Sequence, residues 1–317
     1  MKFRTGSFKS IALSAAALLL LAGAGSAQAA APKKYIIGFS QATMNVGHRV
    51  AMANVNVQYA KEHYPDVEVI LTDGQDNATK QVADVESLIA RKVDVLMISP
   101  ITAEALTGVV KRAREAGIKV VTLDRTVNCP VDVHVGAENL PIGIKVADFL
   151  NTKLNGKGNI IEIQGTAGAS ATIERHDGFN AELKKFPGLK VVGNQYCDYL
   201  RENAMKYTED MLQRFGPGQI SAIYAHNDEE ALGALKAVEA ANRQKEILIC
   251  GVDGEELAIE AVKAGRMAMT ITYPYCAPEG IQTAYKVAKG EPVSAKLVLG
   301  NDQIDASNVD KWIGKGF

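Results

Sequence analysis

The chain has 317 residues, of which 47% are hydrophobic and 22% are charged, and its formal net charge at pH 7 is −1. A chain of this length can bury a sizeable core and is long enough for more than one domain. Its balanced charge gives no indication of a nucleic-acid partner, because such proteins usually carry a basic excess.

Residues 1–31 have the three parts of a secretory signal peptide. A basic region comes first, with Lys2, Arg4 and Lys9. Residues 11–24 are apolar but too short to span a bilayer with ease, and the sequence AQA at 27–29 matches a cleavage site. We expect cleavage near residues 29–31, export to the periplasm and no membrane insertion of the mature chain. Removal of these residues leaves 32 basic against 36 acidic residues, a net charge of −4.

The first half of the mature chain alternates short apolar runs with longer helical patterns. We predict strands at 35–39, 68–71, 93–98 and 118–123, and helices at 46–63, 78–91 and 103–116. The strands are nearly continuous apolar runs, as expected when a sheet is buried on both faces. This alternation predicts a parallel sheet covered by helices on both sides.

The same rhythm then begins again. We predict helices at 144–154, 171–185, 202–215, 229–241 and 257–264, and strands at 160–163, 189–195, 222–225, 247–252 and 267–272. Two α/β sheets of this size indicate two domains. A late helix at 278–289 and a strand at 297–299 are expected to return the chain to the first of them.

One stretch in the second half, residues 160–179, combines a strand, a small-residue loop and the start of a helix. Loops of this kind let a ligand approach the backbone, and the helix start offers unpaired N–H groups. Arg175, one to two turns into the helix, could reach back over the loop and donate to ligand oxygens. The alternative is that Arg175 is a surface residue of an ordinary βα unit. Ser170 in the loop could act as a nucleophile in an enzyme, but we expect it to cap the helix.

Polar residues follow the carboxyl ends of the predicted strands, where open parallel sheets bind their ligands. In the first half these are Ser40, Gln41, Asp124 and Arg125, and in the second half Asn227, Asp253 and Tyr273. Carboxylates, amides and arginines suit a neutral polyhydroxylated ligand, because each hydroxyl both donates and accepts. His48, Tyr273 and Tyr275 could cover the C–H faces of a sugar. Each residue alone could equally be a loop or cap residue.

Four cysteines stand at positions 129, 197, 250 and 276, without a C-x-x-C pair. This spacing indicates no zinc site, and we expect no metal and no cofactor. Export permits disulfides, and the three pairings that four cysteines allow stay open. Cys250 lies in an apolar run and could be a small buried hydrophobe.

Several longer motifs resemble periplasmic sugar-binding proteins of the ribose-binding type, which supply solutes to ATP-driven importers. They read IGFSQ at 37–41, DGQDN at 73–77, ISP at 98–100, LDR at 123–125, QGTAGASATIERHDGF at 164–179, YAHNDEEALGAL at 224–235 and GVDG at 251–254. Within that group the likeness is greatest to galactofuranose-binding proteins, which also carry a glycine–aromatic–arginine turn, here residues 47–49.

The resemblance implies two similar doubly wound domains joined by a hinge, with the ligand in the cleft between them. It implies chain crossings near Glu138, Tyr273 and Asp302, and hence an N-terminal lobe of residues 32–137 and 274–303 and a C-terminal lobe of residues 138–273 and 304–317. It also implies an inner-membrane ABC permease as partner, and a monomer is expected.

The resemblance further implies a set of ligand-binding residues. From the first lobe these would be Ser40, Gln41, His48, Arg49, Asp124 and Arg125, and from the second lobe and hinge Arg175, Asn227, Asp253 and Tyr273. His48 stands where a larger aromatic residue is common, and Tyr273 where ribose-binding relatives carry glutamine. These two departures leave the ligand open among pentoses, furanose hexoses and polyols.

Three other functions and one other ligand are alternatives to the binding of a sugar for transport. A periplasmic sensor that presents a sugar to a membrane receptor would use the same residues. An exported carbohydrate-active enzyme lacks support from G-x-S-x-G, H-E-x-x-H or G-x-G-x-x-G motifs. A repressor of this architecture is disfavoured by the signal peptide and the missing helix-turn-helix. A phosphate at the loop 165–170 is disfavoured because the loop contains no lysine.

Overall fold

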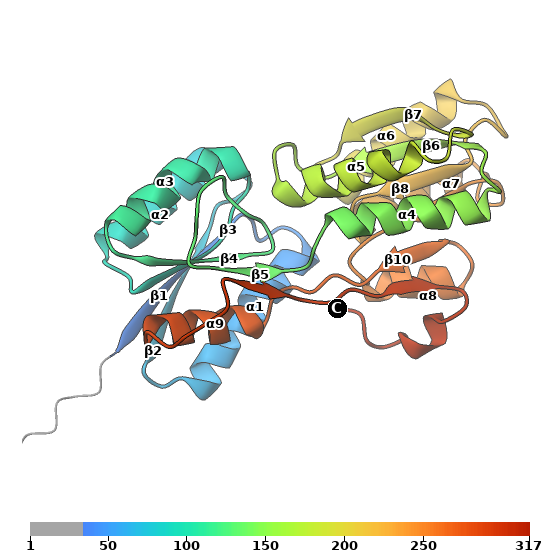
Figure 1. Ribbon diagram of the computed structural model, residues 1–317. Coiled ribbons are helices and arrows are strands. Elements are labelled where there is room, and N and C mark those ends of the chain that lie inside the picture. The colour runs from blue at the N-terminus through green and yellow to red at the C-terminus, as the bar shows by residue number, and fades with distance from the viewer. Residues whose placement is uncertain (1–33) are drawn as a thin grey trace, which may run out of the picture. The chain divides into compact units, whose positions relative to one another are not determined.

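The computed structural model describes residues 34–317 (Figure 1). The predicted signal peptide lies outside these residues. Within residues 34–317, no helix combines the length and the apolar character that a membrane crossing requires.

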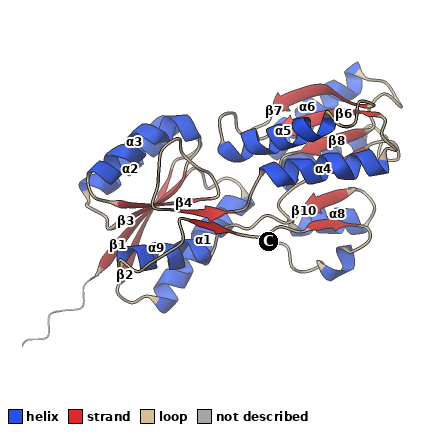
Figure 2. Ribbon diagram, viewed as in Figure 1, coloured by secondary structure: helices blue, strands red, loops and turns tan. Residues whose placement is uncertain are grey.

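Strands and helices alternate through most of the described chain (Figure 2). The strands are β1 (Tyr35–Gln41), β2 (Val67–Asp73), β3 (Val95–Ser99), β4 (Lys119–Leu123), β5 (Val133–Gly136), β6 (Gly158–Gln164), β7 (Leu189–Tyr196), β8 (Ala222–Ala225), β9 (Leu248–Cys250), β10 (Met269–Ile271), β11 (Lys296–Val298) and β12 (Gln303–Asp305). The helices are α1 (Gly47–His63), α2 (Ala78–Ala90), α3 (Ala103–Glu115), α4 (Leu140–Lys153), α5 (Ser170–Leu183), α6 (Arg201–Arg214), α7 (Asp228–Ala240), α8 (Glu256–Lys263), α9 (Glu279–Ala288) and the short 3₁₀ helix η1 (Val309–Lys311).

Two six-stranded sheets share one topology. The first has the order β11-β5-β4-β3-β1-β2 and the second β12-β10-β9-β8-β6-β7. All pairings in the first sheet are parallel, and in the second only β12 runs antiparallel to its neighbour β10. In each sheet the chain begins in the interior, at β1 or β6, and builds outward in both directions, which places a topological switch point beside that strand.

Each sheet is buried on both faces. Met52 of α1 and Ile281 of α9 pack on one face of the first sheet, and Leu88 of α2 and Leu106 of α3 belong to the cluster on the other. In the second sheet α4 and α5 cover one face, while α6, α7 and α8 cover the other. The strands β3 and β8 are buried at every residue, which explains their continuous apolar sequence.

The chain passes between the two sheets three times within the described residues. Residues 137–139 connect β5 to α4, residues 272–278 connect β10 to α9, and residues 299–302 connect β11 to β12. Two of these segments are bonded to each other, because the N–H of Thr272 donates to Asp302 O and the N–H of Asp302 donates to Thr272 Oγ1, both at 2.8 Å. The exact residue boundaries of the two lobes stay a prediction.

Several elements differ from the sequence prediction, and four of them show why. Strands β5 and β12 were not expected, because each has only four or three residues and lies at or near a sheet edge. Helix α4 begins at Leu140, with Pro141 in its first turn, four residues earlier than predicted. Strand β1 extends to Gln41, two residues beyond the predicted end.

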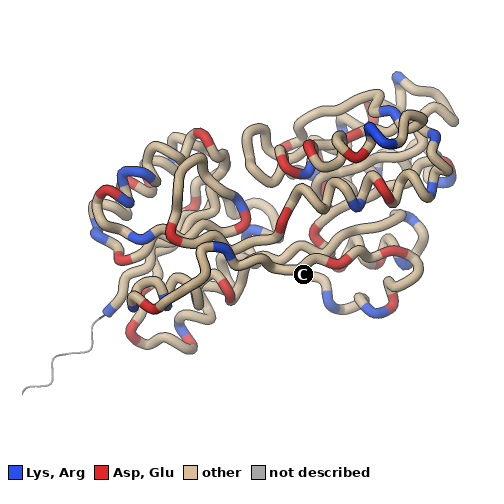
Figure 3. The backbone as a smooth tube through the Cα atoms, viewed as in Figure 1, with Lys and Arg blue, Asp and Glu red and all other residues tan. Residues whose placement is uncertain are grey.

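Basic and acidic residues are interspersed along the whole described chain (Figure 3). Exposed pairs such as Lys34 with Glu68, at 2.7 Å, bring opposite charges together on the surface. This mixed surface agrees with the absence of a basic excess in the sequence.

Helices α4 and α5 pack so closely that the contact requires glycine. A Cβ at Gly178 of α5 would lie 2.1 Å from the carbonyl oxygen of Leu140 on α4. We therefore expect Gly178→Ala to lower the unfolding free energy by about 1–3 kcal/mol, the usual cost of overpacking. Urea unfolding monitored by circular dichroism measures this change.

The matched control is Gly108→Ala on the exposed face of α3, where the nearest atom to a new Cβ would be 3.7 Å away. This variant should be as stable as the parent or more stable, because alanine is the better helix former. Equal unfolding free energies for the two variants would contradict the close packing of α4 on α5.

Candidate functional site

A partly open cavity lies where the carboxyl ends of the two sheets meet. It is lined by Thr43, Asn45, Val46, His48, Arg49, Asp76, Asp124, Arg125, Thr166, Ala171, Arg175, Asp198, Tyr199, Asn227, Asp253 and Tyr273. These residues follow β1, β2 and β4 of the first sheet and β6, β7, β8, β9 and β10 of the second. A ligand of monosaccharide size would therefore contact both lobes.

Eight of the ten candidate residues from the sequence line this cavity, and Ser40 and Gln41 do not. Both are fully buried, because β1 continues through them: Ser40 pairs with Ile98 and Gln41 with Ser99 of β3. Gln41 Nε2 donates to Arg49 O at 3.4 Å. These two residues hold the end of β1 and the start of α1 in place.

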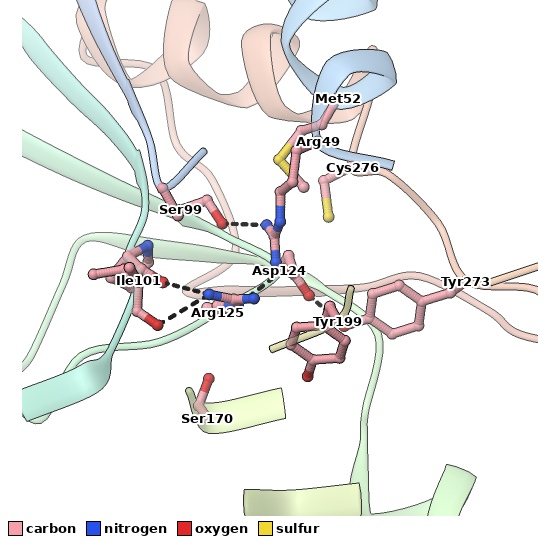
Figure 4. A network of polar contacts seen from close by, with 12 residues as sticks. Arg49, Met52, Ser99, Ile101, Asp124, Arg125, Ser170, Tyr199, Tyr273 and Cys276 are labelled. Carbon is pink, nitrogen blue, oxygen red and sulfur yellow. Dashed lines mark hydrogen bonds and ion pairs between the residues drawn. The ribbon is translucent and has the colours of Figure 1, made fainter. Parts of the chain in front are cut away.

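The carboxylate of Asp124 is the centre of a charged network (Figure 4). Its Oδ2 lies 2.5 Å from Nη2 of Arg49 and 3.9 Å from Nε of Arg125. The hydroxyl of Tyr273 donates to Oδ1 at 2.5 Å. Burial raises the pKa of Asp124, but the neighbouring positive charges, that of Arg49 first, and the hydrogen bond from Tyr273 together outweigh it and hold that pKa well below its usual range. Asp124 is therefore ionised at neutral pH.

The two arginines are fixed by neutral oxygens on their other sides. Arg49 Nη1 donates to Ser99 Oγ at 2.6 Å, and Arg125 Nη1 donates to Ile101 O at 2.9 Å. Burial and the neighbouring charge of Arg49 lower the pKa of Arg125 to about 10, which leaves it protonated at neutral pH. Arg125 Nε is buried without a hydrogen-bond partner among the described residues, so a donor remains for a ligand.

Arg175 reaches the cavity from α5, as the sequence predicted, and is also braced by the protein. Its Nε donates to Asn139 Oδ1 at 2.9 Å, and Nη1 donates to His226 O. Its guanidinium lies over the ring of Tyr273, 4.4 Å from the centroid. Arg175 is buried, so the alternative of a surface residue is wrong; it lines the cavity and also supports the fold.

Asp253 faces the cavity from the second sheet with no side-chain hydrogen bond to any described residue. Burial, together with the nearby carboxylates of Asp228 and Asp124, raises its pKa well above the ordinary value, although Arg175 opposes the shift. Its neighbour Asp228 is bonded within the protein, accepting from Gly254 N at 2.8 Å, Glu255 N at 2.9 Å and the hydroxyl of Thr270. Of these two neighbouring carboxyl groups, Asp253 is the one that is free to bind a ligand.

Three ring-bearing side chains line the cavity, namely His48, Tyr199 and Tyr273. The rings of His48 and Tyr273 have centroids 5.5 Å apart. Tyr199 was missed by the sequence reading. It follows the end of β7 by three residues, has a left-handed backbone with φ of 63°, and lies under the guanidinium of Arg125 at 5.3 Å. Tyr199 could have been found by also examining the residues that follow the carboxyl end of β7, where parallel sheets bind ligands.

Two further expectations, for Ser170 and for Asn227, are corrected or refined. Ser170 does not cap α5, whose cap residue is Ala169 without a side-chain bond. Instead Ser170 Oγ accepts from the N–H of Thr126, 2.9 Å away in the loop after β4. Asn227 caps α7, because its side chain accepts from Glu230 N at 2.8 Å, and it lines the cavity as well.

A buried carboxylate behind the cavity wall, that of Glu162, supports His226. Glu162 of β6 is fully buried, and its Oε1 lies 3.1 Å from His226 Nε2 and 3.0 Å from His176 Nδ1. Burial raises the pKa of Glu162, but the hydrogen bonds from both histidines outweigh it and lower the pKa to about 2. An ionised carboxylate can only accept, so His226 carries its proton on Nε2.

A second cavity also borders Asp124 and is lined by His134, Glu138, Glu174 and Lys296 among others. All four cysteines are free thiols in the structure. Within residues 34–317 no group of three histidine, cysteine or acidic side chains is arranged to hold a metal ion.

Residues 37–292 match the family described as the periplasmic binding protein domain. The chain belongs to this family. Its members bind solutes, so this periplasmic binding protein is not an enzyme, as the sequence predicted. The two lobes with six-stranded sheets have the type I fold of the family.

Individual relatives support the same assignment. The chain is 37% identical to the ribose import binding protein of Haemophilus influenzae, over 72% of this chain and 78% of the relative. It is 31% identical to the galactofuranose-binding protein of Escherichia coli, over 83% of this chain and 85% of the relative. A solved ABC transporter solute-binding protein of Mycobacterium smegmatis, with bound glycerol, superposes with a TM-score of 0.83 at 36% identity and covers 89% of this chain and 97% of that one.

The contribution of His48 to the stability of this binding protein should fall as the pH drops below 6.5. Burial and the charge of Arg49 lower the pKa of His48 from 6.5 to about 3. Between these values the unfolded chain binds a proton at this position that the folded protein does not, so folding loses free energy as the pH falls. The pKa values of His134 and His226 are also lowered by burial and act in the same direction, whereas His176, raised by Glu162, acts in the opposite one.

We expect a fall in pH from 6.5 to 5 to shift the unfolding free energy in favour of His48→Phe relative to the parent, because only the parent loses the contribution of His48. The difference in slope can reach about 1.4 kcal/mol for each pH unit, the equivalent of one proton. Urea titrations at several pH values measure it. Parallel curves for parent and variant would show that His48 is not held neutral by the fold.

Proposed function

We propose that this protein captures a neutral monosaccharide or polyol, such as a pentose, a furanose hexose or a related polyol, and delivers it to an inner-membrane ABC permease. Export by the predicted signal peptide would place this capture in the periplasm. Binding between the two lobes would close them around the ligand by hinge motion, a common response of two-lobed binding proteins.

The observation that carries the proposal is the composition of the cavity wall. Three arginines and four aspartates line it, so the wall contains both signs of charge and no excess of positive charge. Such a wall suits an uncharged ligand with many hydroxyl groups, because each hydroxyl can donate to a carboxylate and accept from a guanidinium. The rings of His48, Tyr199 and Tyr273 offer apolar faces for its C–H groups.

The named ligands of the relatives support this class. The relatives described above are a ribose import binding protein, a galactofuranose-binding protein and a solute-binding protein with bound glycerol. All three compounds are neutral and polyhydroxylated. Because they differ in size and ring form, they support the ligand class and leave the individual sugar to experiment.

A thermal-shift screen over pentoses, hexoses and polyols tests the proposal. A ligand at about 100 times its dissociation constant stabilises the folded state by about 2.7 kcal/mol. For a chain of this size that corresponds to a rise in melting temperature of roughly 5–10 °C. A rise only with charged compounds, or hydrolysis of a glycoside during incubation, would contradict the proposal.

A pair of neighbouring aspartates tests the ligand-binding role of the cavity wall. Asp253→Asn should weaken binding of the ligand from the screen by roughly 3- to 10-fold, the range for one hydrogen bond between neutral groups. It should leave the melting temperature of the ligand-free protein nearly unchanged, because Asp253 makes no side-chain hydrogen bond in the fold and its raised pKa already favours a neutral group at this position. Isothermal calorimetry and thermal melting measure the two effects.

Asp228→Asn is the matched control. It removes an acceptor that binds two backbone N–H groups and a hydroxyl, so the ligand-free protein should melt several degrees lower. An unchanged dissociation constant for Asp253→Asn would remove this residue from the binding site.

A further inference from the structure

The C-terminal tail, residues 312–317, is anchored on the second lobe. Trp312 packs against the same hydrophobic cluster as helices α6, α7 and α8, next to the buried Val309. Beyond Trp312 the carboxylate of Glu256, the first residue of α8, accepts from Gly314 N at 2.8 Å and from Gly316 N at 2.9 Å. Both oxygens of one half-buried carboxylate therefore bind the tail.

Glycine is required where the tail passes α8. A Cβ at Gly316 would lie 2.3 Å from the backbone nitrogen of Glu256. The close approach lets the tail run directly over the start of α8 and extend beyond the second lobe.

The end of the tail contacts the first lobe and the connecting segment. The ring of Phe317 has its centroid 5.9 Å from that of His48, at the start of α1, and 5.9 Å from that of Tyr275, in the segment between β10 and α9. Gly47 packs beside it, since a Cβ there would lie 3.6 Å from the ring. The edge-to-face angles, 65° and 76°, are those that aromatic rings prefer.

His48 connects this contact to the cavity. The centroid of its ring also lies 5.5 Å from that of Tyr273, and both residues line the cavity. His48 is buried, and its Nε2 has no hydrogen-bond partner among the described residues. Phe317 therefore packs against a side chain whose free ring nitrogen is available to a ligand hydroxyl.

We propose that Phe317 is a positioning residue, which holds His48 in the wall of the binding cavity and, through the anchor at Glu256, clasps the second lobe to the first while ligand is bound. The clasp rests on the proposed function, because it acts on the same cavity. A residue of the second lobe that packs on the first must separate from it when the lobes open. Loss of the ring should accordingly speed ligand release more than it slows ligand capture.

The first experiment measures association and dissociation rates of the sugar or polyol from the screen by stopped-flow fluorescence. Phe317→Ala should raise the dissociation rate by about 5- to 30-fold, the equivalent of two aromatic contacts, and change the association rate little. Phe317→Tyr should restore the rate of the parent, because the ring is kept. Ile313→Ala is the matched control, since Ile313 is an apolar residue of the same tail with the same 37% exposure.

A double variant separates a clasp from general destabilisation. Glu256→Ala frees the tail and leaves Phe317 intact, so it should raise the dissociation rate as Phe317→Ala does. The variant with both changes should release ligand no faster than either single variant, because the two act through one contact. Additive effects, or an effect of Ile313→Ala equal to that of Phe317→Ala, would overturn the clasp.

A second experiment needs no ligand and so separates failure of the clasp from failure of the proposed function. His48 is surrounded by Arg49, Asp124 and Arg175, and its pKa in the parent is about 3. In Phe317→Ala the imidazole should gain contact with water, and its titration by NMR should move upward by at least one pH unit. An unchanged titration together with an unchanged dissociation rate would overturn the positioning role, whatever ligand the parent binds.

Discussion

A buried carboxylate must be paired, and the pairing of Asp124 organises this site. An unpaired charge in the interior costs several kcal/mol, so Asp124 holds its partners firmly. Arg49 comes from α1 and Arg125 follows β4, while Tyr273 belongs to a segment that connects the lobes. One charge therefore joins the first sheet to the connection between the sheets. A bound ligand has to add to these bonds or share them.

Two carboxyl groups of the cavity wall, one from each sheet, are in different states. Arg49 keeps Asp124 ionised, whereas burial and neighbouring carboxylates favour the neutral form of Asp253. An ionised carboxylate only accepts hydrogen bonds, and a neutral one also donates. Together with Arg175, these groups can match hydroxyls that donate on one side of a ligand and accept on the other. The wall can therefore favour a neutral ligand through its hydrogen-bond donors and acceptors, and it needs no net charge to do so.

The sequence was sufficient for the alternation of strands and helices, for the two sheets and for most of the cavity wall. Continuous apolar runs predict buried parallel strands, and residues that follow such strands must gather at one edge, which placed Asp124, Asn227 and Asp253 correctly. The rule fails where the end of a strand is predicted too early. Ser40 and Gln41 still belong to β1 and pair with β3. The rule also gives no information on contacts between residues far apart in the chain. The packing of Phe317 on His48, and of Tyr199 under Arg125, belongs to that kind and required the structure.

The position of the bound ligand in a crystal structure tests the central claim most directly. The account predicts a neutral polyhydroxylated ligand in the cavity between the sheets, with hydroxyls within hydrogen-bond distance of Asp124 and Asp253 and a ring or carbon face against His48, Tyr199 or Tyr273. A ligand bound instead in the second cavity, beside His134 and Lys296, would contradict it. So would a ligand in the first cavity that leaves both carboxyl groups without contact.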